Sequence, residues 1–425
     1  MTRRVQAHSP KYFAVHGATN RRVYTFLAVG FTIGLCLGYV AMGTVHAFLA
    51  IGAEKHHQEQ PAAEQQEAAL ADANLAAQRQ QQQQAAAEQQ LLEAVEKEAA
   101  QQQVAGSPYL NFQTRIMYAT FKLAQAMPGG EKLAAFTRIL HRTENDILVN
   151  EVPTFRANPQ HPECDEWCEY PVADRPSAVR QFFNAVKKDP TMVQAPWLYM
   201  IETDYVWMKP LQMPPAEDTS ARPIVFPFGY IQPTHANAAA VMRKYYPETQ
   251  GPLSNIPNTG PAPAVMRVAE WLKVIPLWEA LADQIEKDPE SVKVLGWVRE
   301  MYAFSLALAL SHTTVDLTEA PKNKLIVQPP ADHVLGDAAC AHYTWGAIFN
   351  DKDGHAVWSF DKRTYTGKEL ETKTPYITEP PPLLDGWRLQ DGVPVDPELH
   401  GTMLEMIRQM NRGVYTLKDI PLTTK

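Results

Sequence analysis

The sequence of 425 residues contains only four cysteines and no Asn-x-Ser/Thr site for N-linked glycans. It also lacks an excess of basic residues, since 39 Lys and Arg stand against 47 Asp and Glu and the formal net charge is −8. Because binding to nucleic-acid phosphates requires a basic surface, this balance argues against a general nucleic-acid-binding protein. We expect a partner that is small or local.

Asp, Glu, Lys and Arg are absent from Val23 to Ala53, a stretch rich in Leu, Val, Ile, Phe, Ala and Gly. About 20 apolar residues suffice to cross a bilayer, so residues 23–53 are predicted to be a transmembrane anchor. Basic residues precede this stretch and acids follow it from Glu54 onward, so the positive-inside rule predicts a type II membrane protein with a cytosolic tail at residues 1–22. The alternative, a cleaved signal peptide, has an apolar segment of only about 7–15 residues.

Large apolar side chains are scarce between residues 54 and 106, where Ala, Gln and Glu dominate. This composition favours a helix but supplies no core, so it predicts a solvated stem. The alternative, a coiled coil, lacks sustained heptads. From residue 107 onward, apolar and aromatic segments are broken by Pro and Gly, so residues 107–425 are predicted to form one lumenal globular domain.

Three cysteines lie outside the predicted anchor, at Cys164, Cys168 and Cys340. In an oxidising compartment, the segment CDEWC predicts a local disulfide between the first two and leaves Cys340 free. The alternative is a metal site formed with His161, but no fourth ligand is evident.

Strand and helix patterns alternate in the globular part. TRIMYATFKLAQAM resembles a strand leading into a helix, GGEKLAAFTRILHR a helix leading into a strand, and RPSAVRQFFNAVKK an amphipathic helix, after which WLYMIETDYVW resembles a strand. This order predicts an α/β fold with a mainly parallel central sheet. Ligands of such sheets bind beyond the carboxyl ends of the strands.

Two carboxylates, Glu202 and Asp204, follow the apolar run in WLYMIETDYVWMKP, at a predicted strand end. An acid-x-acid pair in this place can hold a divalent cation, which in turn holds a diphosphate. The alternative is a solvated strand end without function. Behind a membrane anchor and in an α/β domain, the pair suggests a nucleotide-sugar glycosyltransferase.

Longer segments narrow the function further. The chain contains, in this order, FTRILH, EVPTF, ETDYVWMKPL, FPFGYI, RKYYPETQGPLSNI, GWVREMYAFSLA, LIVQPP, HYTWG and FDKR. Over about residues 110–365, this combination resembles the plant and algal hydroxyproline O-arabinosyltransferases and their relatives, the peptidyl serine galactosyltransferases. The resemblance implies a retaining GT-A-type transferase that uses UDP-β-L-arabinofuranose and manganese in the Golgi or the ER/cis-Golgi. The implied acceptor is a hydroxyproline-rich peptide.

The acid motif departs from the family pattern, which is E-P-D-H in land-plant members. Thr203 and Tyr205 stand here in place of the Pro and the His, while both carboxylates are kept. The identity of the transferred sugar is therefore less well supported than the fold.

Four further residues are candidates for binding the metal or the donor. The resemblance implies that His342 in AHYTWG is a third metal ligand; the alternative is a hydrogen-bonded core histidine. Lys362 and Arg363 in FDKR are predicted to clamp the diphosphate, with a solvated basic surface as the alternative. Arg138 in FTRILH is a second candidate for the nucleotide, and a structural salt bridge is its alternative.

The acceptor side has two candidate segments. Glu300 in GWVREMYAFSLA is flanked by aromatic residues and is predicted to orient the acceptor hydroxyl; the alternative is that these aromatics belong to the core. The segment FPFGYI, with Phe226, Phe228 and Tyr230, has the same two interpretations and is a candidate for contact with an extended peptide in polyproline II conformation.

We therefore expect a membrane-anchored enzyme that transfers arabinofuranose to hydroxyproline in secreted cell-wall glycoproteins. One alternative is transfer of galactose to peptidyl serine. Another is a catalytically silent interaction protein, which would be expected to lose Glu202, Asp204 or His342, yet all three are present.

Overall fold

The computed structural model describes residues 107–215, 217–344 and 346–421. All of these residues belong to a single compact unit. None of the helices in this described part is long and apolar enough to cross a membrane. The predicted tail, anchor and stem at residues 1–106 lie outside the described residues and stay predictions.

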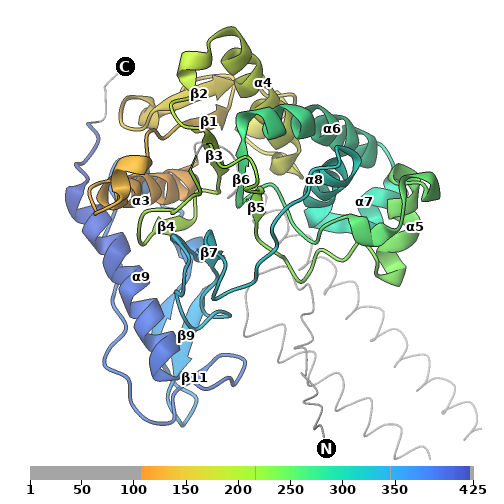
Figure 1. Cartoon of the computed structure of the whole chain (residues 1–425). Helices are drawn as coiled ribbons and strands as arrows, with labels where there is room; N and C mark the ends of the chain where they lie inside the picture. Colours follow the sequence, from red (N-terminus) through yellow and green to blue (C-terminus); the bar gives the residue numbers. More distant parts are fainter. Residues whose placement is uncertain (1–106, 216, 345, 422–425) are drawn as a thin grey trace, which may run out of the picture. The chain divides into compact units, whose positions relative to one another are not determined.

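Helices and strands both contribute to this unit (Figure 1). The α-helices are α3 (Pro108–Gln125), α4 (Arg175–Lys188), α5 (Ala236–Tyr245), α6 (Val268–Glu286), α7 (Pro289–Leu295), α8 (Arg299–Leu310) and α9 (Pro397–Thr416). The strands are β1 (Arg138–His141), β2 (Thr154–Ala157), β3 (Trp197–Met200), β4 (Tyr205–Trp207), β5 (Ile224–Val225), β6 (Ala264–Arg267), β7 (Ile326–Val327), β8 (Cys340–His342), β9 (Ala347–Asn350), β10 (Ala356–Phe360) and β11 (Arg388–Leu389). The predicted mixed α/β class is confirmed.

The prediction of a mainly parallel sheet is wrong for the described strands. They form four small sheets with the orders β1-β2, β3-β6-β5, β4-β8-β7 and β10-β9-β11. Only β1 with β2 and β7 with β8 are parallel, whereas the other five pairs of named strands are antiparallel. A parallel sheet needs a crossover helix between successive strands, but here α6, α7 and α8 follow one another without an intervening strand.

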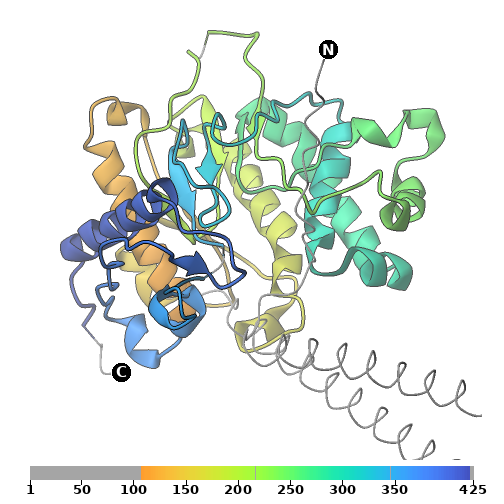
Figure 2. The same ribbon diagram turned by 90° about the horizontal axis from the view of Figure 1, so that it is seen from below.

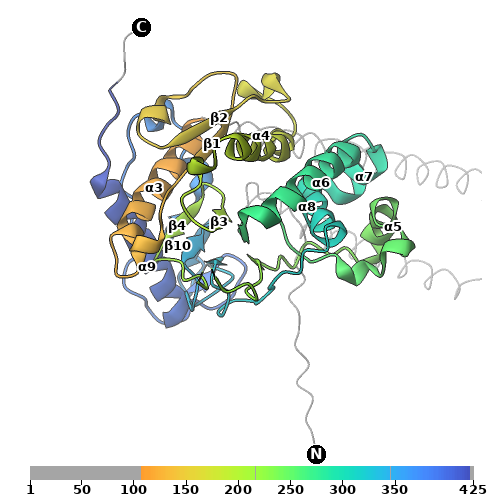
Figure 3. The ribbon, with the colours of Figure 1, turned by 45° about the horizontal axis from the view of Figure 1, so that its top comes forward.

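Helices α3 and α9 lie side by side on one side of the strands, although they come from opposite ends of the described chain (Figures 1 and 3). Gly413 of α9 makes this close approach possible, because a Cβ at this position would lie only 3.0 Å from Cγ2 of Thr120 in α3. The side chains of Phe112, Ile116 and Met410 are fully buried in a shared core. Apolar burial therefore fixes α9 against α3.

Helices α6 and α8 pack together on the other side of the strands, as two further views show (Figures 2 and 3). Aromatic rings fill the space between them: the ring centroid of Phe304 lies 6.0 Å from Trp271 and 5.4 Å from Trp278. Helix α4 packs against α6, with Phe183 6.0 Å from Trp271. This core supports the beginnings of α4 and α8, which carry Arg175 and Glu300.

The predicted amphipathic helix RPSAVRQFFNAVKK is confirmed as α4. The single strand predicted in WLYMIETDYVW is instead two strands, β3 and β4, which belong to different sheets. TRIMYATFKLAQAM contains no strand, because α3 begins at Pro108 behind a cap in which Ser107 accepts the N–H of Leu110. In GGEKLAAFTRILHR the strand β1 is confirmed, but the helix is reduced to one 3-10 turn at Gly130–Lys132.

The predicted disulfide between Cys164 and Cys168 is confirmed, and their Cα atoms are 4.7 Å apart. Cys340 is a free, buried cysteine in β8. His161, the third residue of the alternative metal site, instead contacts Asp174, with 2.6 Å between Nδ1 and the carboxylate oxygen. The CDEWC segment is thus a covalently closed loop.

Candidate active site

Asp204 and His342 are brought together by the pairing of β4 with β8. Tyr205 lies opposite His342 in this antiparallel pair, so Asp204, which directly precedes β4, lies next to the carboxyl end of β8. The backbone N–H of Tyr343 donates to the carbonyl of Asp204 at 3.3 Å. As a result, Nε2 of His342 lies 3.2 Å from Oδ2 of Asp204, across 138 positions of sequence.

Glu202 lies in the same cluster. One ligand atom from each of Glu202, Asp204 and His342 lies within 4.8 Å of the other two. Asp204 and His342 are 6% and 4% exposed, whereas Glu202 is half-buried. Asp204 is therefore not a solvated strand end, and the three residues predicted as metal ligands converge on one place.

The imidazole of His342 is held at both nitrogens. Nδ1 lies 3.0 Å from the hydroxyl of Thr344, and that hydroxyl accepts a hydrogen bond of 3.0 Å from the amide of Gln328. The ring of Tyr205 packs against the imidazole with 4.4 Å between centroids. Such contacts around a ligand histidine orient the ring, here with Nε2 toward Asp204.

Lys362 reaches this cluster directly. It begins a 3-10 turn at Lys362–Thr364, just after β10, and its Nζ donates to Oδ2 of Asp204. Burial alone would raise the pKa of Asp204, but Lys362 and then His342 outweigh it and hold that pKa well below its usual range. Arg363 is engaged with its neighbour Asp361, with a bond of 2.6 Å from Nη2 to Oδ2.

Arg175 is a second cation of the site, and it was not among the residues predicted from the sequence. Its Nη2 donates to Oε1 of Glu202 at 2.6 Å, and its Nη1 lies 3.4 Å from Oε2 of Glu300. The guanidinium thus joins two carboxylates that are far apart in sequence. The sequence carried only a general signal, because a basic residue in the first turn of a helix faces the positive end of the helix dipole, and this does not identify its acidic partners.

The first turn of α8 places Glu300 beside Arg175. Glu300 is only 3% exposed, and its Oε1 has no hydrogen-bond partner among the described residues. Burial raises the pKa of Glu300 to about 7, with Arg175 opposing this and the negative charge of Glu202 adding to it. Glu300 is therefore linked to Glu202 through the guanidinium of Arg175.

We expect the ionisation of Glu300 to make stability fall with rising pH. The folded-state pKa of about 7 lies above the ordinary value of 4.5, so the folded chain holds this proton more tightly than the unfolded chain. The penalty is absent below pH 4.5, grows up to pH 7 and is complete above it, at about 3 kcal/mol. Arg175, Glu202 and Tyr170 are the charged or titratable groups that influence this carboxyl or its backbone.

The measurement is the free energy of unfolding of Glu300→Gln relative to wild type at pH 5 and at pH 8. The difference should shift in favour of the variant by about 2 kcal/mol over this range. Glu131→Gln, at an exposed position, serves as the control and should show no such shift. A constant difference for Glu300→Gln would contradict the prediction.

Two of the aromatic residues near Glu300, Tyr302 and Phe304, belong to the core. Tyr302 and Phe304 are 5% and 0% exposed, and Trp297 packs edge-on against Tyr170 at 5.3 Å. The core alternative for this segment therefore agrees with the structure.

Arg138 lies in β1 and donates to both carboxylate oxygens of Asp146, at 2.8 and 2.6 Å. It also donates to the hydroxyl of Thr154 at 3.2 Å. This arrangement is the structural salt bridge considered as its alternative. A role in nucleotide binding stays a prediction without support from these contacts.

Tyr230 is the exposed aromatic residue of FPFGYI. Phe226 and Phe228 are buried at 7% and 2%, while Tyr230 is 37% exposed and its ring lies 5.2 Å from that of Phe228. The pKa of the Tyr230 hydroxyl is raised by desolvation and then by the negative charges of Glu202 and Asp204. The ring therefore lies near the carboxylate cluster with part of its surface free.

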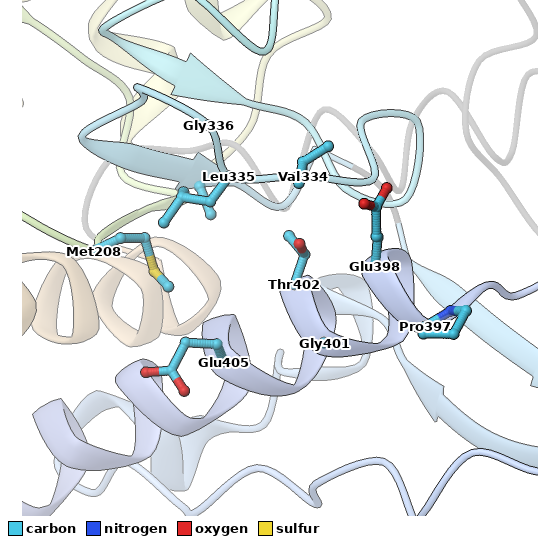
Figure 4. Close-up of a pocket in the computed structure, with 10 residues that line it drawn as sticks. Met208, Val334, Leu335, Gly336, Pro397, Glu398, Gly401, Thr402 and Glu405 are labelled. Carbon is cyan, nitrogen blue, oxygen red and sulfur yellow. The ribbon is translucent and has the colours of Figure 1, made fainter.

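A cavity of about 320 Å³ lies elsewhere, between the first half of α9 and the segment around Val334 (Figure 4). Ala341 and Met208 line it, but none of the candidate site residues does. Ala341 precedes His342 in β8, and successive residues of a strand face opposite sides. The cavity is thus on the far side of β8 from the cluster.

Comparison with known proteins gives one consistent family. The model described as "Hydroxyproline O-arabinosyltransferase family N-terminal domain" matches residues 101–317. Hydroxyproline O-arabinosyltransferase 1 of Arabidopsis thaliana is 35% identical over 282 residues, which cover 65% of this chain and 72% of that protein. Hydroxyproline O-arabinosyltransferase NOD3 of Pisum sativum is 33% identical over 279 residues, covering 64% and 78%.

A third relative, hydroxyproline O-arabinosyltransferase RDN2 of Medicago truncatula, is 31% identical over 311 residues, covering 72% of this chain and 78% of that protein. No solved structure matches the chain. The family match includes Arg175, Glu202, Asp204 and Glu300 but ends before His342 and Lys362. His342 and Lys362 lie beyond the matched family model, and the structure places both of them beside Asp204.

Proposed function

Because the chain belongs to the hydroxyproline O-arabinosyltransferase family, we propose that it transfers arabinofuranose from UDP-β-L-arabinofuranose to hydroxyproline in secreted cell-wall glycoproteins. The names of the relatives support this sugar and this acceptor. The observation that carries the assignment is the convergence of Glu202, Asp204 and His342 beside Lys362. Two carboxylates, an imidazole and an ammonium suit a divalent ion together with a nucleoside diphosphate.

We assign Glu202, Asp204 and His342 as the ligands of manganese. Carboxylate oxygens and imidazole are both accepted by this ion. Oδ1 of Asp204 is buried without a hydrogen-bond partner among the described residues, so the cluster retains an unused acceptor of the kind that a cation requires. When bound, a divalent ion supplies positive charge that offsets the charge on the departing diphosphate.

Lys362, a cation of the chain itself, is proposed to support the departure of the diphosphate. The reaction breaks the bond between C1 of the sugar and the β-phosphate oxygen and forms a bond between C1 and the hydroxyproline oxygen. With retention, the acceptor approaches from the face of the leaving phosphate, whose oxygen takes the hydroxyl proton. Lys362 is the side chain in the cluster that can contact the diphosphate, and its charge stabilises the leaving group.

Glu300 has a positioning role in this proposal. It was a candidate for direct contact with the acceptor, but its carboxylate is buried and contacts Arg175. Arg175 in turn holds Oε1 of Glu202. Glu300 therefore acts on the cluster through Arg175.

Tyr230 is our candidate for contact with the acceptor. A partly exposed aromatic ring next to a reaction centre suits stacking against a proline-type ring. We expect Tyr230→Ala to raise KM for a hydroxyproline-rich peptide about 10-fold, with a much smaller change in KM for the donor. Steady-state kinetics with each substrate varied in turn checks this. Tyr376→Ala, at an exposed tyrosine, is the control, and equal effects of the two substitutions would contradict the assignment.

The location of the enzyme is part of the same proposal. An anchor at residues 23–53 and a stem at residues 54–106 would hold the described domain in the lumen of the Golgi or the ER/cis-Golgi. The composition of the two segments supports this. In that compartment the UDP-sugar and the secreted peptide would meet.

Product analysis tests the function. The full chain is incubated with manganese, a panel of UDP-sugars and either a hydroxyproline-rich or a serine-containing peptide, and the product mass is read. We expect one pentose to be added to the hydroxyproline peptide. Addition of a hexose to serine would favour the galactosyltransferase alternative, and no product with any pair would favour the silent interaction protein.

A further inference from the structure

The carboxylates of the cluster are already neutralised by the chain itself. Lys362 contacts Oδ2 of Asp204, and Arg175 contacts Oε1 of Glu202 at 2.6 Å. The Lys362–Asp204 pair is largely shielded, with side chains 13% and 8% exposed, whereas the side chains of Arg175 and Glu202 are 25% and 34% exposed. Asp204 and Glu202 thus each have a cationic partner within the chain before any ion or substrate arrives.

A divalent ion that binds at the cluster meets carboxylates that already have cationic partners. The ion must compete with the ammonium of Lys362 for the carboxylate of Asp204, and Oδ2 is also shared with Nε2 of His342 at 3.2 Å. If the ammonium leaves Asp204 with no new partner, a mostly buried charge is left unpaired, which is costly. A nucleoside diphosphate removes this cost because it offers the ammonium new acceptor oxygens.

We propose that Lys362 is a resident counter-ion of Asp204 that weakens divalent-ion binding in the free enzyme and moves to the diphosphate when the donor binds. Divalent ion and nucleoside diphosphate therefore bind with positive cooperativity, and Lys362 carries part of that coupling. This inference rests on the proposed function, since it needs a UDP-sugar site at the cluster. It goes beyond that function by assigning how the two ligands depend on each other.

The two cations differ in a way that makes Lys362 the one to move. The guanidinium of Arg175 is fixed between two carboxylates, Glu202 and Glu300. The ammonium of Lys362 is a compact charge on a flexible four-carbon stem, without the planar geometry that restricts arginine. It also sits on a single 3-10 turn rather than inside a sheet or a long helix. A shift of this side chain leaves the neighbouring elements in place.

The test is manganese binding rather than turnover. The dissociation constant of Mn²⁺ is measured with the metal-free full chain by the loss of the electron paramagnetic resonance signal of free Mn²⁺, with and without UDP. In wild type we expect UDP to tighten Mn²⁺ binding about 10-fold or more. In Lys362→Met, Mn²⁺ alone should bind several-fold more tightly than in wild type, and the effect of UDP should shrink to about 3-fold or less.

Two controls accompany this measurement: one keeps the positive charge at position 362, and the other removes an exposed lysine outside the cluster. Lys362→Arg keeps a cation beside Asp204 and should bind Mn²⁺ alone about as weakly as wild type. Lys352→Met, at an exposed lysine, should leave both the affinity and the coupling unchanged. Thermal unfolding verifies that each variant is folded at the measuring temperature, and the arginine variant keeps the comparison possible if the methionine variant is unstable.

The outcomes distinguish this inference from the proposed function. Equal or weaker Mn²⁺ binding in Lys362→Met, with the UDP effect intact, overturns the counter-ion role while the metal site remains. If wild type binds no Mn²⁺ even with UDP, the metal-dependent function fails and the inference fails with it. Tighter Mn²⁺ binding in the methionine variant together with lost coupling supports both.

Discussion

Replacing Asp204 with Asn is expected to lower kcat/KM for sugar transfer by about 100-fold or more and to remove its dependence on manganese. The substitution keeps the size of the side chain but removes the negative charge that lies between Lys362 and His342. A metal ligand that supports a leaving group contributes several kcal/mol to the rate, and 100-fold corresponds to about 2.7 kcal/mol. Kinetics over a manganese titration measure the effect.

Stability has to be followed in the same variants. A solvated strand end would tolerate Asp204→Ala without loss of stability, but Asp204 is 6% exposed and paired with Lys362. Removing the whole carboxylate leaves the ammonium without this partner and is expected to cost about 3 kcal/mol. Asp204→Asn should cost less, because its amide oxygen still accepts from Lys362. Asp385→Asn, at an exposed position, is the control, and near-normal, manganese-dependent transfer by Asp204→Asn would refute the assigned site.

Glu202, Asp204 and His342 were predictable from the sequence because each of them lies in a short, recognisable motif. Two acids directly behind an apolar strand are visible without any structure, and the resemblance to the family identified His342 as their partner. The structure adds the reason for their meeting, which is the pairing of β4 with β8. Sequence spacing alone does not contain this, since strand pairing depends on burial on both faces.

Arg175 was not predictable in the same way. Its helix was recognised as amphipathic, but its role depends on two contacts, with Glu202 and with Glu300, which only the folded chain brings together. The prediction of a mainly parallel sheet was wrong for a related reason. Alternating helices and strands suggested parallel crossovers, while β6 runs antiparallel to both of its neighbours.

Helix α3 shows where hydrophobic periodicity fails to predict secondary structure. Its buried residues occupy nearly every side of the helix, including the β-branched Thr114 and Ile116. A helix buried all round carries no clear 3.6-residue pattern and is easily mistaken for a strand. The cap at Ser107 and the proline after it were the better signal.

Replacing Arg175 with Met is expected to lower both stability and activity, through two different contacts. It leaves Glu300, whose side chain is 4% exposed, without its cation, and it frees Glu202 from a hydrogen bond of 2.6 Å. We expect a loss of about 2–3 kcal/mol in the free energy of unfolding near pH 8, since a buried carboxylate is left unpaired. We also expect kcat/KM to fall by about 10- to 100-fold.

A second substitution separates the two contacts. In Arg175→Met combined with Glu300→Gln, no ionised carboxylate remains at the buried position, so most of the lost stability should return. The activity should not return, because Glu202 still lacks the guanidinium that positions it. Chemical denaturation and steady-state kinetics on the two single variants and the double variant complete this cycle. If activity recovered together with stability, Arg175 would be a structural residue only, and the link from Glu300 through Arg175 to Glu202 would have no role in catalysis.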